Sequence, residues 1–289
     1  MTFREKLLAA ARAHRSWLCV GLDPDPARLP IPDVAAFNRA IIEATAELVC
    51  AFKPNLAFYE ALGLPGLRAL EATLKAVPAG IPVIADAKRG DVGPSAQAYA
   101  RALFETWGFD AATVNPYGGG DTVEPFLAYR DKGVFVWCRS SNPGAGDFQD
   151  LVLSEPSPRV PQATPVPLYV QVARRALEWN SRGNAGLVVG ATYPEQLRGL
   201  RQLCPTMVFL VPGVGPQGGE VEAAVAAGAD QRGELAIISA SRQVLYASGG
   251  KDFAAAARRE AGGLRDRINA RREPSPGPAH AGPAPAGPD

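Results

Sequence analysis

The chain has 289 residues, of which 47% are hydrophobic and 20% are charged, and this is enough apolar material for one large α/β domain or two ordinary ones. Its formal net charge is +1 without a long basic run, which argues against a nucleic-acid partner, because such binding needs clustered Lys and Arg. No apolar run approaches the roughly 18–20 residues that span a bilayer, so no membrane segment is expected.

Eight segments with strand-like sequences alternate with helical segments. The predicted strands are Trp17–Leu22, Ala51–Asn55, Val83–Asp91, Ala111–Asn115, Gly133–Cys138, Gly186–Val189, Met207–Val211 and Leu235–Ser239. The predicted helices are Met1–Arg15, Val34–Val49, Ala57–Val77, Pro94–Trp107, a segment from Asp121, Leu168–Asn180, Pro194–Leu203, Glu220–Ala227, Ser241–Ala247 and Asp252–Ala270. Asp33 is expected to cap the second helix, and Pro94 to occupy the first turn of the fourth.

This alternation predicts a single-domain (β/α)8 TIM barrel over residues 1–272. The alternative is a doubly wound open sheet, which would want a G-x-G-x-x-G turn after the first strand, where the chain has Asp23-Pro24-Asp25-Pro26 instead. The five prolines of Glu155–Pro167 predict a long surface loop of the kind that forms lids or binding segments. Residues 273–289 are nearly all Pro, Ala and Gly, which predicts a disordered tail.

The few cysteines and histidines limit the kinds of catalytic and metal sites that the chain can form. The four cysteines are far apart in the sequence and form no C-x-x-C pair, which fits buried thiols in a reducing, cytoplasmic compartment. The first helix contains Glu5 and does not resemble a signal peptide. Only His14 and His280 are present, so a Ser-His-Asp triad, a Cys–His pair or a three-histidine zinc site is not expected. Any catalysis must rest on Lys, Asp, Ser and Arg.

One run, Val83–Asp91, concentrates charge at the end of an apolar strand. Side chains alternate along a strand, so Asp86 and Lys88 should point to the same side, and Asp91 can return toward the same ammonium after Gly90. Three charges at a strand end are costly to desolvate unless they pair with one another or with a ligand. A salt-bridged strand terminus without function is the plain alternative.

In a barrel, the carboxyl ends of all strands open at one mouth, where active sites are built. That mouth would also collect Asp23, Lys53 and Asn115 from the first, second and fourth strands. Alternating acids and lysines can hold one another in place through charge-assisted hydrogen bonds. Each residue alone is an ordinary structural feature, but their convergence favours a functional site.

A second feature of the mouth is an anion-binding pattern after the last two strands. The turn Pro212–Gly219 contains four glycines, which let backbone N–H groups approach an anion closely. The helix from Glu220 would direct its amino terminus at the same place, and Arg242 could supply a bidentate guanidinium. TIM barrels often bind phosphate here, so we expect a phosphate site.

The run Asp86-Ala-Lys88-Arg-Gly-Asp91 resembles the D-x-K-x-x-D signature of the orotidine 5′-phosphate decarboxylase family. Four further segments resemble its long-form subfamily: Asn115–Gly119, Ser140–Gly144, Pro212–Gly219 and Ser239–Arg242. The match runs in order from about Trp17 to Tyr246. The resemblance implies decarboxylation of orotidine 5′-phosphate to uridine 5′-phosphate, without metal or cofactor, in the last step of pyrimidine nucleotide synthesis.

The resemblance also implies roles for individual residues. Lys88 would donate a proton to carbon 6 of the pyrimidine, Asp86 would lie against the substrate carboxylate, and Asp91 would complete the site of the neighbouring subunit in a homodimer. The residues implied in substrate binding are Asp23, Lys53, Ser95, Asn115, Ser141, Gln217, Gly218 and Arg242. Within this set, Lys53 and Asp23 would bind the ribose, Ser141 the pyrimidine, and Gln217 and Arg242 the phosphate. The family usually has Thr where this chain has Ser95, which keeps the hydroxyl and loses a methyl group.

Two alternatives stay open at this point. The chain could be another phosphate-binding barrel enzyme, either a sugar-phosphate decarboxylase, which normally needs magnesium, or a Schiff-base aldolase. It could also be a nucleotide-binding barrel without catalysis. The intact set of Asp86, Lys88 and Asp91 argues against the second alternative.

Overall fold

The computed structural model describes residues 1–153, 165–215 and 218–272, and these contain a closed sheet of eight parallel strands. The strands are β1 (Leu18–Gly21), β2 (Ala51–Lys53), β3 (Ile84–Arg89), β4 (Ala111–Val114), β5 (Gly133–Arg139), β8 (Ala185–Val189), β9 (Val208–Pro212) and β10 (Ala236–Ala240). They are neighbours in the order β2-β1-β10-β9-β8-β5-β4-β3. Parallel bridges from Phe52 to Val83 and from Asn55 to Asp86 join β2 to β3, so the sheet closes on itself. The predicted (β/α)8 barrel is confirmed, and the open sheet is excluded.

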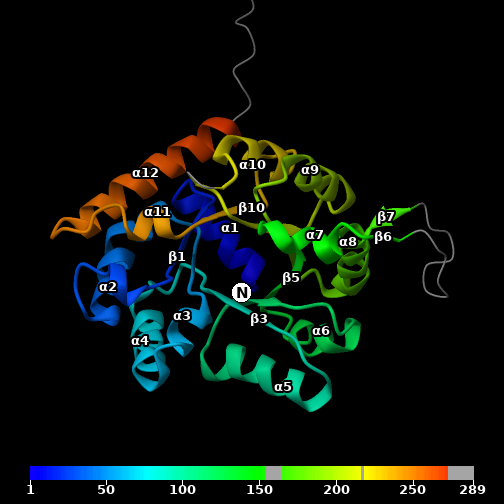
Figure 1. Ribbon diagram of the computed structural model, residues 1–289, viewed down its shortest axis with the longest axis horizontal. Coiled ribbons are helices and arrows are strands. Elements are labelled where there is room, and N and C mark those ends of the chain that lie inside the picture. The colour runs from blue at the N-terminus through cyan, green and yellow to red at the C-terminus, as the bar shows by residue number, and fades with distance from the viewer. Residues whose placement is uncertain (154–164, 216–217, 273–289) are drawn as a thin grey trace, which may run out of the picture.

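Helices surround the barrel on its outside (Figure 1). The longer ones are α2 (Val34–Thr45), α4 (Gly63–Ala76), α5 (Gly93–Arg101), α6 (Gly120–Leu127), α8 (Leu168–Trp179), α9 (Pro194–Leu203), α10 (Val221–Gly228) and α12 (Phe253–Arg272). The short helices are α3 (Leu56–Glu60), α7 (Gly146–Gln149) and α11 (Arg242–Leu245). As predicted, Asp33 caps α2 by accepting a hydrogen bond from the N–H of Ala36, and Pro94 lies in the first turn of α5.

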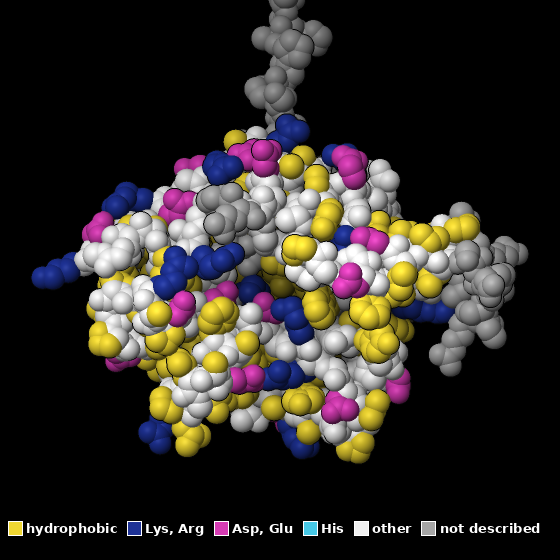
Figure 2. Space-filling view, in the orientation of Figure 1, with side chains coloured by type: hydrophobic (Ala, Val, Ile, Leu, Met, Phe, Trp, Pro, Cys, Tyr) yellow, Lys and Arg dark blue, Asp and Glu magenta, His cyan; other side chains and the backbone are white. Residues whose placement is uncertain are grey.

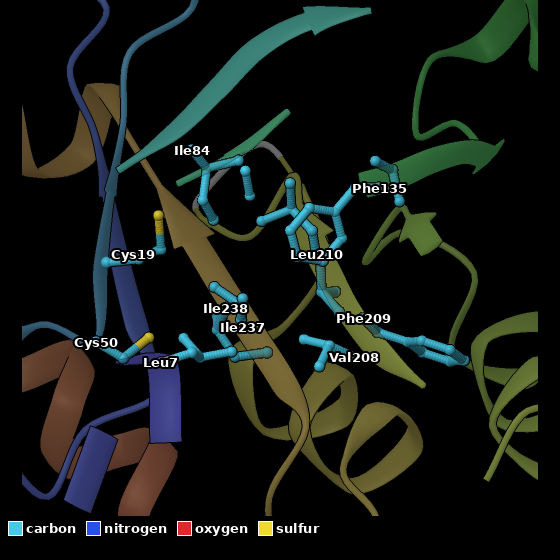
Figure 3. Packing of buried hydrophobic residues seen from close by; sticks show 14 of the residues in the cluster. Leu7, Cys19, Cys50, Ile84, Phe135, Val208, Phe209, Leu210, Ile237 and Ile238 are labelled. Atoms are coloured by element: carbon cyan, nitrogen blue, oxygen red, sulfur yellow. The ribbon is translucent and has the colours of Figure 1, made fainter. Parts of the chain in front are cut away.

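The core fills the barrel and the layer between strands and helices. Every residue of β1, β4, β8 and β10 is buried, as expected for parallel strands covered on both faces. Ile84 of β3, Leu210 of β9 and Ile237 of β10 are members of this core that solvent barely reaches (Figure 3). Such enclosure fixes the directions of the strands, and therefore the positions of the residues that follow them.

Helix α1 (Phe3–Ala13) lies against the amino-terminal ends of the strands and within the ring of helices (Figure 1). The ring of Phe3 meets Phe135 of β5 edge-on, with centroids 5.6 Å apart. Gly133 leaves room for this contact, because a Cβ there would lie 2.4 Å from the Phe3 ring. The opposite end of the barrel is left for the loops that carry the site.

Three predicted elements differ from the structure. The helix expected over Ala57–Val77 is two helices, α3 and α4, because Gly63 has φ +63° and an α-helix cannot continue through that conformation. The helix expected from Pro94 to Trp107 changes after Arg101 into one π-helical turn, Ala102–Thr106. A 3-10 turn likewise replaces the end of the second predicted helix.

Most of the predicted loop Glu155–Pro167 lies outside the described residues, as does the predicted tail 273–289. The end of that loop is not irregular, because β7 (Val166–Pro167) pairs antiparallel with β6 (Val152–Leu153). These two short strands project from the edge of the barrel beside α8 (Figure 1). No helix in the described ranges is both long and apolar enough to cross a membrane.

Candidate active site

A cavity of about 740 Å³ opens at the carboxyl ends of the barrel strands. It lies near the centre of the face in Figure 2, with Lys or Arg and Asp or Glu side chains at its edge. Its size is that of a pocket for a small organic ligand. Six of the residues predicted from the sequence line it: Asp23, Lys53, Asp86, Ser141, Gly218 and Arg242.

A carboxylate lies between two ammonium groups at this cavity, and two of these three residues, Lys53 and Asp86, line it. Oδ2 of Asp86 accepts a hydrogen bond from Nζ of Lys53 at 2.9 Å, and Oδ1 accepts one from Nζ of Lys88 at 2.5 Å. The exposed fractions of these side chains are 4% for Lys53, 12% for Asp86 and 34% for Lys88. Lys88 is therefore the most exposed member of the array.

The charges of the array stabilise one another. Burial alone would raise the pKa of Asp86, but Lys53 and Lys88 outweigh it and hold that pKa well below its usual range. Burial would lower the pKa of Lys53, but Asp23 and Asp86 outweigh it and hold that pKa above its usual range. The buried pair thus stays ionised at neutral pH, as a fixed electrostatic field requires.

The backbone of Lys88 is irregular. Its φ is +45°, in the left-handed region that residues with a side chain rarely adopt. The pairing of β3 with β4 also shifts register between Ala85 and Arg89. Simple alternation correctly predicted that Asp86 and Lys88 meet, but the strand reaches that contact through a distortion. Such distortions in enzymes often accompany functional residues.

Asp23 lies at the end of β1, next to the array. Its Oδ1 accepts a hydrogen bond from the backbone N–H of Asn55 at 3.1 Å, which ties the first two strand ends together. Gly21 allows the loops to converge, because a Cβ there would lie 1.9 Å from Oγ of Ser241 and 3.2 Å from Oδ2 of Asp23. The sequence feature that closes this side of the pocket is therefore a glycine.

The glycine-rich turn after β9 forms another wall of the cavity. Gly213 and Gly215 have φ of +89° and +136°, which explains the choice of glycine at both positions. Gly213 also lies close to Ser141, since a Cβ on it would be 3.1 Å from the Ser141 hydroxyl. Arg242, the first residue of α11, is exposed at the same cavity and has no acidic partner within the described residues. Gln217 lies outside the described residues.

Four predicted residues are not among those that line the cavity: Lys88, whose ammonium contacts Asp86 of the cavity wall, and Asp91, Ser95 and Asn115. Asp91 is exposed, accepts a hydrogen bond from the N–H of Val92, and forms no ion pair with Lys88 in the described part of this chain. Ser95 is exposed on α5. The side chain of Asn115 accepts a hydrogen bond from the N–H of Tyr117. Asn115 directly follows the carboxyl end of β4, and its role in substrate binding stays a prediction.

The cavity also contains residues that the sequence interpretation did not select. They are Arg28, Phe58, Thr192, Ser239, Ser241 and Gln243. Ser239 and Ser241 follow the strand-end rule and could have been selected by it. Arg28 could not, because its place depends on the guanidinium lying 4.0 Å above the ring of Tyr246. Among the described residues, no three His, Cys, Asp or Glu side chains are grouped as metal ligands would be.

Fold and site together define a (β/α)8-barrel enzyme, with a preformed Lys–Asp–Lys array at the carboxyl ends of its strands. The family model described as "Orotidine 5'-phosphate decarboxylase / HUMPS family" matches residues 16–259. The chain belongs to this family.

Proteins similar to this chain agree with the assignment. An orotidine 5′-phosphate decarboxylase from a Roseiflexus species is 52% identical over 277 residues, which cover 93% of this chain and 98% of the relative. One from Thermomicrobium roseum is 50% identical over 286 residues, covering 96% of this chain and 99% of the relative. The solved structure of Leishmania donovani OMP decarboxylase matches with a TM-score of 0.80 and 41% identity, covering 94% of this chain and 99% of that one.

Proposed function

We propose that this chain decarboxylates orotidine 5′-phosphate to uridine 5′-phosphate, with Lys88 as the proton donor. The observation that carries the proposal is the Lys53–Asp86–Lys88 array at the cavity, in which Lys88 is the exposed ammonium. The family of the chain and its relatives at 50–52% identity support the same reaction.

The reaction needs a positive charge held next to carbon 6 of the pyrimidine. When the bond between carbon 6 and the carboxylate breaks, carbon dioxide leaves and the electron pair stays on carbon 6 in the ring plane. The Lys88 ammonium would stabilise this carbanion and then transfer its proton, forming the new C–H bond, and the amine would recover a proton from water. Because Lys88 already lies 2.5 Å from Asp86, its ammonium needs little reorganisation during the reaction.

Asp86 would act on the substrate carboxylate. With its pKa held well below the usual range by Lys53 and Lys88 despite burial, it stays ionised and repels a second carboxylate placed beside it. That repulsion disappears when carbon dioxide leaves, so it favours the transition state over the bound substrate. Lys53 would keep Asp86 in place and, with Asp23, bind the ribose hydroxyls.

The other wall of the cavity would bind the rest of the nucleotide. Arg242, Gly218 and Gln217 would hold the phosphate, and Ser141 would contact the pyrimidine. The exposed guanidinium of Arg242 and the open turn at Gly213 support this division. Binding energy from the remote phosphate could then be used to lower the barrier at carbon 6.

We also propose that two copies of the chain share their sites. Asp91 and Ser95 are exposed and lie outside the cavity of their own chain, while both belong to the motif region that carries the family resemblance. In a homodimer Asp91 would complete the partner's array, and Ser95 and Asn115 would contribute to substrate binding. A cytoplasmic location fits the cysteines, since all four are buried and unpaired.

The direct test is loss of orotidine 5′-phosphate absorbance with purified protein, measured with and without EDTA. We expect turnover that EDTA does not change. Turnover that EDTA abolishes would indicate a metal-dependent sugar-phosphate type of enzyme, and a borohydride-trapped substrate adduct would indicate a Schiff-base aldolase. Tight binding of uridine 5′-phosphate without turnover would indicate a non-catalytic barrel.

A further inference from the structure

We propose that Thr113 is a positioning residue for the Lys88–Asp86 pair, acting through a single hydroxyl that holds the end of β3 in its irregular conformation. The proposal rests on the proposed function for the identity of the reacting lysine. Thr113 belongs to β4 and is only 1% exposed, so its side chain is closed off from a substrate.

The pairing between β3 and β4 shows what the hydroxyl does. The regular register pairs Ala85 with Ala112 and resumes at Arg89 with Val114. Between these points three residues of β3 face one residue of β4, which is Thr113. The excess residues include Asp86 and Lys88, so the distortion falls on the charged array.

The hydroxyl of Thr113 replaces the missing backbone pairing. Its Oγ1 accepts hydrogen bonds from the N–H of Ala87 at 3.0 Å and from the N–H of Lys88 at 2.9 Å. It lies 3.1 Å from Oδ1 of Asp86, to which it can donate, and 3.5 Å from the carbonyl oxygen of Ala85. One side chain therefore satisfies two backbone donors and orients the carboxylate between the two lysines.

Oγ1 of Thr113 contacts both residues of the Lys88–Asp86 pair. Oδ1 of Asp86 is the oxygen that binds Nζ of Lys88 at 2.5 Å. The hydroxyl thus fixes the backbone of Lys88, whose φ is +45°, and the oxygen toward which its ammonium points. Without it, two partly buried N–H groups would lose their acceptor and the strand end would relax, which would move the ammonium.

The test compares variants that separate the hydroxyl from the shape of the side chain. Thr113→Val keeps the shape and removes the hydroxyl, whereas Thr113→Ser keeps the hydroxyl and removes the methyl group. Thr45→Val is the control, because Thr45 is equally buried and its hydroxyl binds only Ile41 O of its own helix. For each variant, kcat and KM for orotidine 5′-phosphate and Kd for uridine 5′-phosphate are measured.

We expect Thr113→Val to lower kcat about 100-fold, as a misplacement of about 1 Å can do, with KM and Kd within about threefold of wild type. Thr113→Ser and Thr45→Val should keep kcat within about threefold. A Thr113→Val enzyme with wild-type kcat, an equal loss in Thr113→Ser, or a loss confined to KM would overturn the proposal. If Thr113→Val does not fold, Thr113→Ala against Thr113→Ser supplies the same comparison. An inactive wild-type protein would contradict the proposed function instead, and a crystal structure of the variant would still report whether Lys88 leaves Asp86.

Discussion

Nζ of Lys53 lies 2.9 Å from Oδ2 of Asp86, and both side chains are almost enclosed by the strand ends around them. A buried carboxylate or ammonium alone would be costly, and removal of one partner of such a pair typically costs about 3–5 kcal/mol. In the folded chain the two charges are already paired before any substrate binds, and the array is therefore fixed in advance. Fixed charges of this kind are the largest single contribution to many enzymatic rate accelerations.

The first prediction concerns the pH dependence of stability. Burial would raise the pKa of Asp86, but Lys53 and Lys88 hold that pKa below its ordinary value of 3.8. A lowered folded-state pKa contributes stability that is present above the unfolded-state pKa and lost as pH falls through the folded-state pKa. Asp86→Asn should therefore be less stable than wild type at pH 7, and the difference should shrink as pH falls from about 5 to about 2.

Urea denaturation at a series of pH values measures this difference in the free energy of unfolding. Lys53 has the opposite pH dependence. Its raised pKa contributes stability that is fully present below pH 10.5 and is lost only as pH rises through the folded-state pKa. No change from Lys53 is therefore expected between about pH 5 and pH 9. A wild-type advantage over Asp86→Asn that stays constant down to pH 2 would contradict this account.

The second prediction concerns the proton donor. Lys88→Ala should lower kcat by about 100-fold to 10,000-fold, the range for loss of a general acid, while uridine 5′-phosphate still binds. Lys75→Ala is a matched control, because Lys75 is exposed on α4 and pairs only with Glu71. Calorimetry gives binding and the absorbance assay gives turnover. A Lys88→Ala enzyme that keeps a tenth of wild-type kcat would show that another group donates the proton.

Much of the fold could be predicted because its signals are local. Short-range rules predict the strands from apolar runs, and they also predict Asp33 at a helix cap and Pro94 in a first helical turn. Eight alternations of strand and helix leave few possible topologies. The break at Gly63 was missed because a glycine within a helical pattern usually costs only about 1 kcal/mol and does not end the helix. Here its φ of +63° turns the chain instead.

The site was predictable to the extent that strand ends converge. This rule found Asp23, Lys53 and Asp86 in one cavity. It did not find Thr113, because the hydroxyl matters only where β3 departs from regular pairing, and no sequence pattern marks that departure. For the same reason, the alternation rule predicts the contact between Lys88 and Asp86 correctly, but it does not predict the left-handed backbone conformation of Lys88.

The third prediction concerns the phosphate. Arg242→Ala should weaken binding of uridine 5′-phosphate by roughly 2–4 kcal/mol, the loss for a charge-assisted contact, and leave uridine binding nearly unchanged. The nucleoside is the internal control, since it lacks only the phosphate. Arg198→Ala is a second control, because Arg198 pairs with Glu195 on α9, outside the cavity. Calorimetry with both ligands decides the matter, and equal losses for the two would exclude Arg242 from the phosphate site.

The fourth prediction tests the shared site with two inactive enzymes. Asp91 is exposed and makes no ion pair with Lys88 in the described part of its own chain, so its proposed role lies in the partner's array. Lys88→Ala and Asp91→Ala homodimers should each be nearly inactive, because every site lacks one member. Mixed dimers should differ, because a C2 arrangement puts both defects in one site and leaves the other intact.

The expected recovery follows from counting sites. After equal amounts of the two variants are unfolded together and refolded, roughly half of the dimers are mixed and about a quarter of all sites are wild type. Activity should therefore rise from near zero to about a quarter of the wild-type value. If Asp91 served its own chain, every site would still lack one residue and mixing would restore nothing. Mass spectrometry of the refolded sample establishes that mixed dimers have formed, so their presence without activity would rule out the shared site.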